Sequence, residues 1–490
     1  MRAWMLAVVL VFSAWVDSSQ AATTLAIVVH DKTALRAEAR DSAIQHAVLW
    51  AGDTLEVRGE RLDYLQVYDH RRERAGFVRT SEVRQLSLQP EHAAELSAIM
   101  GFLRDSVGDE SLGIAYAAAF LQAAPAKMIG ADAFDALGTL ADRLARRASS
   151  NRSAAQEIVL AAHLEVVASY GVHIRSFEQG GRMQLCYDGE AFRRVLALPA
   201  SDEQKARAAL ALTRPECVDP DLTPVQRHEL DNWRTEVLDR APRDHLSDLL
   251  ENRLRVRSAA VWASVAFQRT RRGEDGSEAA ERALQELTSV DPRQLAESDT
   301  EDYTEASIRV GASRWAAQPM TPSKSDLAIA TEAGEPGQTC IALTDKKHPP
   351  KSPLIKRCTF ATVWPNSVRI DAQGSALTLA VQPMEGWREL WLFHRVGDHW
   401  QIDIAPPGTD SPEVGYIEFA GWVPGGKKLL AARESRVGGR FQQSFEVLDL
   451  ATLNVDKRAD KPEYLSLFYR WQDPIWKAQT LSLRDTDSKH

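Results

Sequence analysis

The sequence predicts a multidomain chain in which short strands come first, helices fill the middle and strands return in the last third. Three observations predict this order. Alternating and β-branched residues dominate positions 23–88, apolar residues recur at helical spacing over 89–320, and seven of the thirteen tryptophans fall after position 339. A length of 490 residues with 44% hydrophobic content suffices for two to four domains with buried cores.

The first residues carry the pattern of a secretory signal. Arg2 precedes an apolar run over positions 3–16, and Ser19-Gln20-Ala21 places small residues at the two positions that a signal peptidase reads. The run is shorter than the roughly 20 residues that span a bilayer. We therefore expect residues 1–21 to be removed, leaving a chain that does not span a membrane and is exported to the periplasm or secreted.

Residues 23–88 are predicted to form a small β-barrel. Leu55 and Val57, then Leu65 and Val67, alternate with polar neighbours at a period of two, and Gly52-Asp53 marks a turn. Five short segments follow one another in an informative order: Ala34-Leu35-Arg36, Val48-Leu49-Trp50-Ala51-Gly52-Asp53, Leu55-Glu56-Val57, Tyr64-Leu65-Gln66-Val67 and Ala75-Gly76-Phe77-Val78.

This order resembles the bacterial SH3 domain, which starts with an "LR" pair and closes with a G-W-V strand. Phe77 stands where the family has Trp, and Tyr64 stands near another usual Trp. The resemblance implies an SH3-like barrel of a kind that often binds cell-wall peptides or partner proteins. Trp50, Tyr64, Tyr68 and Phe77 are the candidates for a ligand groove on one face. The alternative is that these aromatic side chains fill the core of the barrel.

Residues 89–320 are predicted to form an all-α domain. Leu96, Ile99, Met100 and Leu103 recur at three- and four-residue steps, and Pro and Gly residues mark short loops between the helices. The stretch from Trp262 to Pro292 is similar to one tetratricopeptide hairpin. Only one such copy is visible, so we expect helical hairpins without assigning that family.

A Pro-, Gly-, Ser- and Thr-containing linker is predicted at 321–338, followed by an all-β domain at 339–490. Two stretches, 374–404 and 426–450, each begin as strand, turn and strand. The segment 422–430, W-V-P-G-G-K-K-L-L, resembles the "W-S-P-D-G-K-x-L" signature of Tol-type periplasmic propellers. A closed propeller needs at least four blades of about 40–50 residues, so we expect blade-like sheets packed as a sandwich, which leaves fewer edges exposed than an open array.

The four cysteines are predicted to form two disulfides. Cys186 precedes a helix expected to start near Asp188, and Cys217 follows a second helix expected from Asp202 to Leu212; an antiparallel helical hairpin would bring these cysteines together. Cys340 and Cys358 flank a loop rich in Lys and Pro, as in a β-hairpin with a long loop.

The sequence carries no phosphate loop, dinucleotide glycine pattern or zinc-protease motif, and we expect no metal and no cofactor. A net charge of -9 argues against a nucleic-acid partner. We therefore expect a non-enzymatic binding or scaffolding protein of the cell envelope whose ligand is a cell-wall peptide or an envelope protein. The alternative is a papain-like cell-wall peptidase with Cys186 as its nucleophile, because Leu185-Cys186-Tyr187-Asp188-Gly189 is superficially similar to the Asp-Cys-Ser-Gly of such enzymes.

Overall fold

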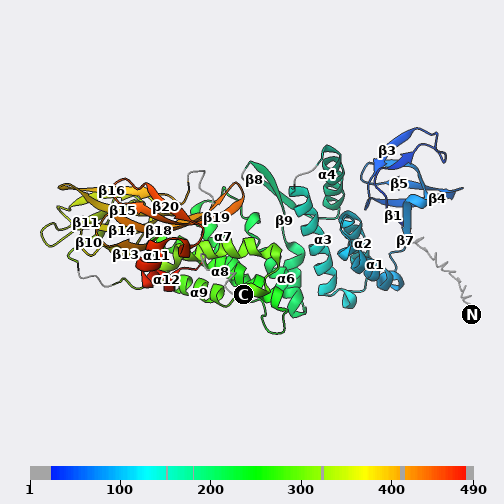
Figure 1. Cartoon of the computed structure of the whole chain (residues 1–490). Helices are drawn as coiled ribbons and strands as arrows, with labels where there is room; N and C mark the ends of the chain where they lie inside the picture. Colours follow the sequence, from blue (N-terminus) through cyan, green and yellow to red (C-terminus); the bar gives the residue numbers. More distant parts are fainter. Residues whose placement is uncertain (1–23, 151–152, 180, 322–324, 409–413, 482–490) are drawn as a thin grey trace, which may run out of the picture. The chain divides into compact units, whose positions relative to one another are not determined.

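A computed structural model describes residues 24–150, 153–179, 181–321, 325–408 and 414–481, so the predicted signal segment lies outside the described residues. The chain divides into two compact units, residues 1–199 and 200–490. Strands come first, helices follow and strands return, in the order expected (Figure 1). The domain boundaries proposed from the sequence stay predictions.

The first unit begins with a seven-stranded antiparallel sheet in the order β3-β2-β6-β5-β4-β1-β7. Its strands are β1 (Leu25–Val28), β2 (Thr33–Arg36), β3 (Gln45–Leu49), β4 (Thr54–Arg61), β5 (Tyr64–Asp69), β6 (Arg74–Arg79) and β7 (Val83–Leu86). Leu65 and Val67 are buried while Gln66 between them is exposed, which confirms the predicted alternation in this strand. The described pairings do not join β3 to β7, and closure into an SH3-like barrel stays a prediction.

The turn between β3 and β4 connects this sheet to helices of the same unit. Ser111 donates its hydroxyl to Ala51 O at 2.8 Å, and the Tyr170 hydroxyl donates to Gly52 O at 2.5 Å. Gly52 has a φ of +95°, and a Cβ there would lie 2.6 Å from Ser111 O. Only glycine therefore allows this close approach. A buried His163 ring also pairs with Asp31 Oδ1 at 2.8 Å.

Five helices complete most of the first unit: α1 (Ala93–Asp105), α2 (Glu110–Ala123), α3 (Ala131–Ser149), α4 (Ala154–Ala168) and α5 (Glu190–Ala197). The alanine-rich α2 buries ten of its residues, which allows α1 and α3 to pack closely on it. A hairpin of β8 (Ile174–Gln179) and β9 (Arg182–Tyr187) interrupts the helices. The expectation of an all-α middle region missed this hairpin, whose strands bury little apart from Cys186.

The second unit begins with α6 (Asp202–Leu212), α7 (Pro224–Asp239), α8 (Asp248–Arg271), α9 (Ser277–Thr288) and α10 (Thr300–Ser313). Capping boxes at Ser201 and Thr223 start α6 and α7, because each hydroxyl accepts a hydrogen bond from an otherwise unpaired backbone N–H. The helices α8, α9 and α10 share one apolar core that includes Ala259, Ala283 and Val310. The expected helical hairpin is therefore present in α8 and α9.

Two sheets follow in this unit. The first has the order β10-β11-β12, with β10 (Ala328–Ala333), β11 (Thr339–Thr344) and β12 (Ile355–Thr359). The second has eight strands: β13 (Thr362–Ile370), β14 (Ala376–Met384), β15 (Trp387–Val396), β16 (His399–Ala405), β17 (Gly415–Val423), β18 (Lys428–Val437), β19 (Arg440–Asp449) and β20 (Val455–Ala459). Part of the predicted linker is thus strand β10.

The two sheets share an apolar core. Ile341 and Leu343 of β11 pack with Leu377 of β14 and with Trp391 and Phe393 of β15. The two stretches proposed as repeats form β14-β15-β16 and β18-β19, and both lie in the eight-stranded sheet. Their likeness to propeller blades stays a prediction.

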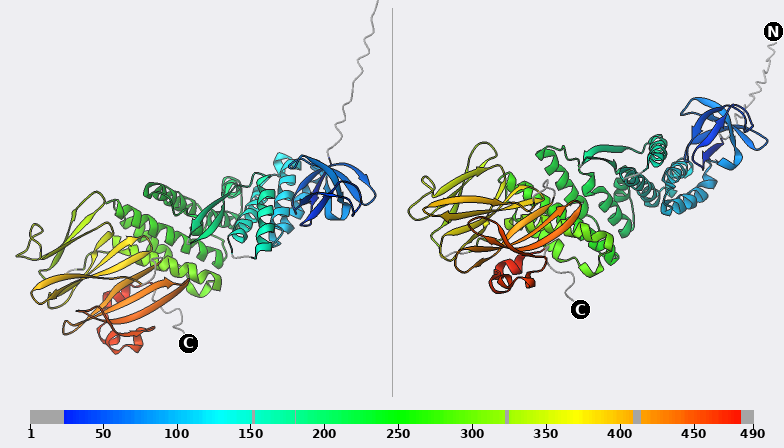
Figure 2. Two further views of the ribbon diagram at one scale, coloured as in Figure 1. Left: turned by 90° about the horizontal axis from the view of Figure 1, so that it is seen from above. Right: turned by 45° about the horizontal axis from the view of Figure 1, so that its top comes forward.

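Two short helices, α11 (Ser466–Trp471) and α12 (Pro474–Gln479), end the described chain and were not predicted from the sequence. The helices α11 and α12, drawn in red, lie against the eight-stranded sheet (Figure 2). Phe468 of α11 and Trp476 of α12 pack against Phe445 of β19, and Ile308 of α10 joins the same core. A helix that precedes the sheet in the sequence and two that follow it therefore contribute to one core with the sheet. Among the described residues, no helix has both the length and the apolar character needed to cross a membrane.

Candidate functional site

Three of the four aromatic residues proposed for a groove share one face of the N-terminal sheet. Tyr64, Gln66 and Tyr68 are alternate residues of β5 and point to the same face of the sheet. Phe77 of β6 lies directly opposite Gln66. Residues opposite each other in an antiparallel pair point to the same side. Trp50 instead follows β3 in a turn, where its backbone N–H donates to Asp53 Oδ2 at 2.9 Å.

Cations cover the two tyrosines on this face. Tyr64 is only 2% exposed, and the Arg79 guanidinium lies 5.0 Å from the centroid of its ring. The Arg58 guanidinium lies 4.1 Å from the centroid of the Tyr68 ring and is held by Glu56 Oε1 at 3.1 Å. Hydrogen bonds from Arg58 and His70 lower the pKa of Glu56. The tyrosines are therefore engaged with neighbouring cations, and Phe77 is the ring on this face for which no such partner is found among the described residues.

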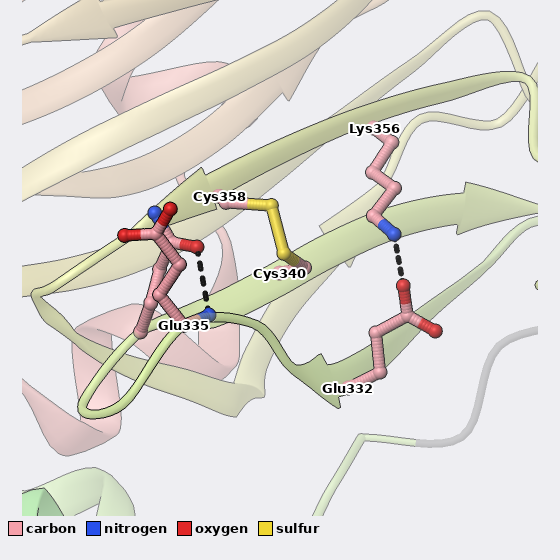
Figure 3. The surroundings of a disulfide bond; sticks show 6 residues. Glu332, Glu335, Cys340, Lys356 and Cys358 are labelled. Carbon is pink, nitrogen blue, oxygen red and sulfur yellow. Dashed lines mark hydrogen bonds and ion pairs between the residues drawn. A yellow bond between two sulfur atoms is a disulfide. The ribbon is translucent and has the colours of Figure 1, made fainter.

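The cysteines are oxidised. Cys340 and Cys358 form a disulfide across the β11–β12 pair, in direct register (Figure 3). Cys186 and Cys217 are also disulfide-bonded, and no described cysteine is free. A disulfide sulfur carries no thiolate, so a papain-like mechanism at Cys186 lacks its attacking group in the oxidised chain. Disulfides are compatible with an exported protein.

A groove of about 590 Å³ lies between β12 and β16 in the second unit. Its lining residues come from these two strands and from the end of β15: Ile355, Lys356, Arg357, Val396, His399, Trp400, Gln401 and Ile402. Among the described strands, β12 pairs only with β11, and β16 pairs only with β15. Each strand therefore presents one row of unpaired backbone groups at an edge of its sheet.

Side-chain alternation gives this groove an apolar floor. Ile355 and Arg357 lie opposite the buried Leu343 and Ile341 of β11, so both point toward the eight-stranded sheet. Trp400 and Ile402 of β16 belong to the apolar core that the two sheets share. The groove thus lies where the edge strands β12 and β16 border the apolar core that the two sheets share.

The charge at the groove is positive. The Arg357 guanidinium lies 5.1 Å from the centroid of the Trp391 ring and forms no ion pair with a described residue. Lys356 is paired with Glu332 on β10, across the intervening β11 (Figure 3). Arg357 is therefore the cation available to a carboxylate in the groove.

A disulfide and a tight turn fix the two strands that form the walls of the groove. The Cys340–Cys358 disulfide ties β12 to β11 next to Arg357. A two-residue turn, Gly397-Asp398, joins β15 to β16, and Gly397 supplies the positive φ of 59° that a tight hairpin favours. The disulfide thus fixes β12 to β11, and the short turn fixes β16 to β15.

Sequence reasoning did not find this groove, because its two walls lie about forty positions apart and neither carries a motif. The long Lys- and Pro-rich loop before β12 and the isolated Trp400 are the signals that point to it in retrospect. Among the described residues, no group of three His, Cys, Asp or Glu side chains is arranged to hold a metal ion. No protein-family model, no curated protein and no solved structure matches this chain.

Proposed function

We propose that this chain is a non-enzymatic binding protein of the bacterial cell envelope, acting in the periplasm or after secretion. Its ligand is an extended peptide segment that carries carboxylates, from the cell wall or from an envelope protein. The observation that supports the proposal best is the β12–β16 groove, in which two unpaired strand edges flank an apolar floor and Arg357.

An extended peptide can use such a site by adding a strand to a sheet edge. Main-chain hydrogen bonds to β12 or β16 would supply affinity, and alternate side chains of the peptide would enter the groove. A carboxylate would pair with the Arg357 guanidinium, which binds carboxylates in a two-pronged geometry. The aromatic ring of Trp400 would pack against apolar side chains of the same peptide.

We propose further that the N-terminal sheet is an SH3-like module that provides a second contact surface, centred on Phe77, and that the C-terminal sheets are related to Tol-type propeller blades. The order of sequence segments supports the first proposal, and residues 422–430 support the second. Cell-wall binding by the N-terminal module predicts that isolated peptidoglycan sediments with the protein and that Phe77→Ser reduces the sedimented fraction. Sedimentation unchanged by that substitution would remove the module from the binding role.

The groove is tested with an eight-residue peptide of alternating Val and Glu, capped at both ends, and with a charge-reversed peptide of Val and Lys. We expect the acidic peptide to bind and to change the tryptophan fluorescence of the full chain. Arg357→Gln should weaken binding by about tenfold, because a hydrogen-bonded charge pair contributes roughly 1.5–3 kcal/mol. Isothermal titration calorimetry measures both affinities.

The matched control is Arg440→Gln, which removes an exposed arginine at the start of β19 in the same sheet but outside the groove. Its affinity for the acidic peptide should equal that of the unchanged chain. Equal affinity for the two peptides, or an affinity that Arg357→Gln leaves unaltered, would contradict the proposal.

A further inference from the structure

A small cavity of about 20 Å³ in the second unit is lined by residues of α12 and of the eight-stranded sheet. That volume holds one species of about the size of a water molecule. Three arginines line it: Arg314 directly after α10, Arg369 on β13 and Arg388 on β15. Each is at most 9% exposed, so bulk water does not solvate their charges.

One carboxylate, that of Glu418, lines the same cavity, and its bonding capacity is already used. Glu418 Oε2 accepts from Arg314 Nη2 at 2.8 Å and from Arg388 Nη2 at 2.9 Å. Glu418 Oε1 accepts from Trp476 Nε1 at 2.7 Å and from Thr480 Oγ1 at 2.9 Å. Three guanidinium charges against one carboxylate leave an excess of two positive charges in the lining.

Arg369 forms no ion pair with a described residue. Its Nη1 donates to the carbonyl of Val368 at 2.9 Å, and its guanidinium lies 5.5 Å from the centroid of the Trp315 ring. Asp473 attracts it electrostatically, but that carboxylate caps α12 by accepting from Ile475 N at 2.7 Å. Burial lowers the pKa of Arg369, and burial together with Arg314 lowers the pKa of Arg388 to about 10. Both pKa values are lowered because these buried positive charges lack enough negative charge beside them.

The cavity lining is also rich in donors that lack an acceptor. Arg314 Nε, Arg388 Nε and Trp315 Nε1 are buried and have no hydrogen-bond partner in the part of the chain that the structure describes. The one unpartnered acceptor among the lining residues is Gln479 Oε1. Buried polar groups in native proteins are nearly always satisfied, so three orphaned donors around one cavity indicate a missing acceptor.

We propose that this cavity binds a single halide-sized anion, chloride under physiological conditions, as a built-in counterion of the arginine cluster. Its negative charge offsets part of the excess positive charge, and a spherical anion accepts hydrogen bonds from several N–H groups at once. Phosphate, sulfate and organic carboxylates exceed the size of the cavity. Through the charges of Arg314, Arg369 and Arg388, the bound anion would join the end of α10 to strands β13 and β15.

The first test compares thermal unfolding of the full chain in sodium chloride and in sodium gluconate at equal ionic strength, so that general screening is the same. A ligand that binds only the folded state raises its stability in proportion to occupancy. We expect chloride to raise the midpoint by about 2–4 °C in a saturable manner. Bromide should act in the same way, and gluconate should have no such effect.

Arg369→Gln should remove most of this chloride-dependent shift, since it lowers the excess charge without touching a ligand of Glu418. Arg440→Gln, which removes an exposed arginine of the same sheet, should retain the full shift. If Arg369→Gln does not fold, the halide response of the unchanged chain and the crystals described next decide the question.

Crystals grown in sodium bromide provide the direct test. We expect an anomalous peak inside the cavity, within hydrogen-bonding reach of Arg314 Nε and Arg388 Nε. Density at that place without an anomalous signal would mean a water molecule and would overturn the proposal. Identical unfolding midpoints in chloride and gluconate would overturn it as well.

Discussion

Replacing Glu418 by Gln tests whether the arginine cluster depends on this single carboxylate. The carboxylate accepts four hydrogen bonds, two of them from the buried guanidinium groups of Arg314 and Arg388. Burial alone would raise the pKa of Glu418, but the two arginines outweigh it and lower that pKa, so the group is charged at neutral pH. Gln keeps the shape of the side chain and removes its charge.

The magnitude follows from the loss of two charge-assisted hydrogen bonds, each contributing about 1.5–3 kcal/mol, offset by the desolvation that burying a carboxylate costs. We expect the free energy of unfolding to fall by about 3–5 kcal/mol, which is typical when one partner of a buried ion pair is removed. Such a loss is a large part of the roughly 5–15 kcal/mol that stabilises most native proteins.

Urea unfolding followed by far-ultraviolet circular dichroism and by tryptophan fluorescence measures this loss. The matched control is Glu463→Gln, at an exposed position of the same unit, which should change the free energy of unfolding by no more than about 0.5 kcal/mol. A loss below about 1 kcal/mol for Glu418→Gln would refute the reasoning. A double-mutant cycle with Arg388→Met should show that the paired substitutions cost less than the sum of the single ones.

Three further predictions concern the two units separately. Replacing Cys340 and Cys358 by Ala opens a loop with a sequence separation of 18 and should lower the free energy of unfolding by about 3 kcal/mol, measured in urea. Burial raises the pKa of Tyr170 to about 12. The contribution of this group to the free energy of unfolding is therefore fully present below pH 10 and is lost as the pH rises from 10 toward 12. Tyr170→Phe should flatten that alkaline decline in a pH series of thermal midpoints. Gly52→Ala should destabilise the chain by at least about 1–3 kcal/mol because of its positive φ and its close approach to an α2 carbonyl, whereas Gly59→Ala, without a positive φ, should cost less; equal losses would contradict this account of the turn.

Local patterns predicted the order of secondary structure well. The periodicity of two at Leu65 and Val67 reflects side-chain alternation within one strand, which the sequence displays directly. The helix predicted from Asp202 to Leu212 has those bounds in the structure. The β11–β12 hairpin was predicted from the two segments that flank the Lys- and Pro-rich loop, in which Cys340 and Cys358 can face each other, and the structure confirms the pairing.

Features that depend on tertiary pairing were not predicted. Strand β10 lies in the proposed linker, and its pairing with β11 outweighs a composition typical of loops. The hairpin of β8 and β9 has mostly half-buried or exposed residues, so it lacks the apolar alternation that marks a strand. The groove and the arginine cavity each join residues from distant segments, which a single sequence cannot bring together without the pairing of strands.

Burial also changes the meaning of the aromatic candidates. Tyr64 was proposed for a groove because it stands near a Trp that is usual in the bacterial SH3 domain, but it is 2% exposed and its hydroxyl donates to Asp41 Oδ1 at 2.7 Å. Composition alone does not distinguish an aromatic ring that binds a ligand from one that is covered by a neighbouring arginine. The strand register makes that distinction, since it places Arg79 opposite Tyr64.

Charge pairing between the helices and the sheet bears on how the proposed peptide would be bound. Glu385, in the turn between β14 and β15, pairs with Arg309 of α10 at 2.7 Å and with Arg227 of α7 at 2.8 Å. Ile308 of α10 is fully buried in the core of the eight-stranded sheet. Separating the helices from the sheet would expose that core and break these pairs, so we expect α7, α10 and the sheet to move together. Because the groove is built on a sheet that the helices support, a bound peptide would lose its own conformational freedom while the protein needs little reordering. Affinity would then depend mainly on the fit of the peptide to β12, β16 and Arg357.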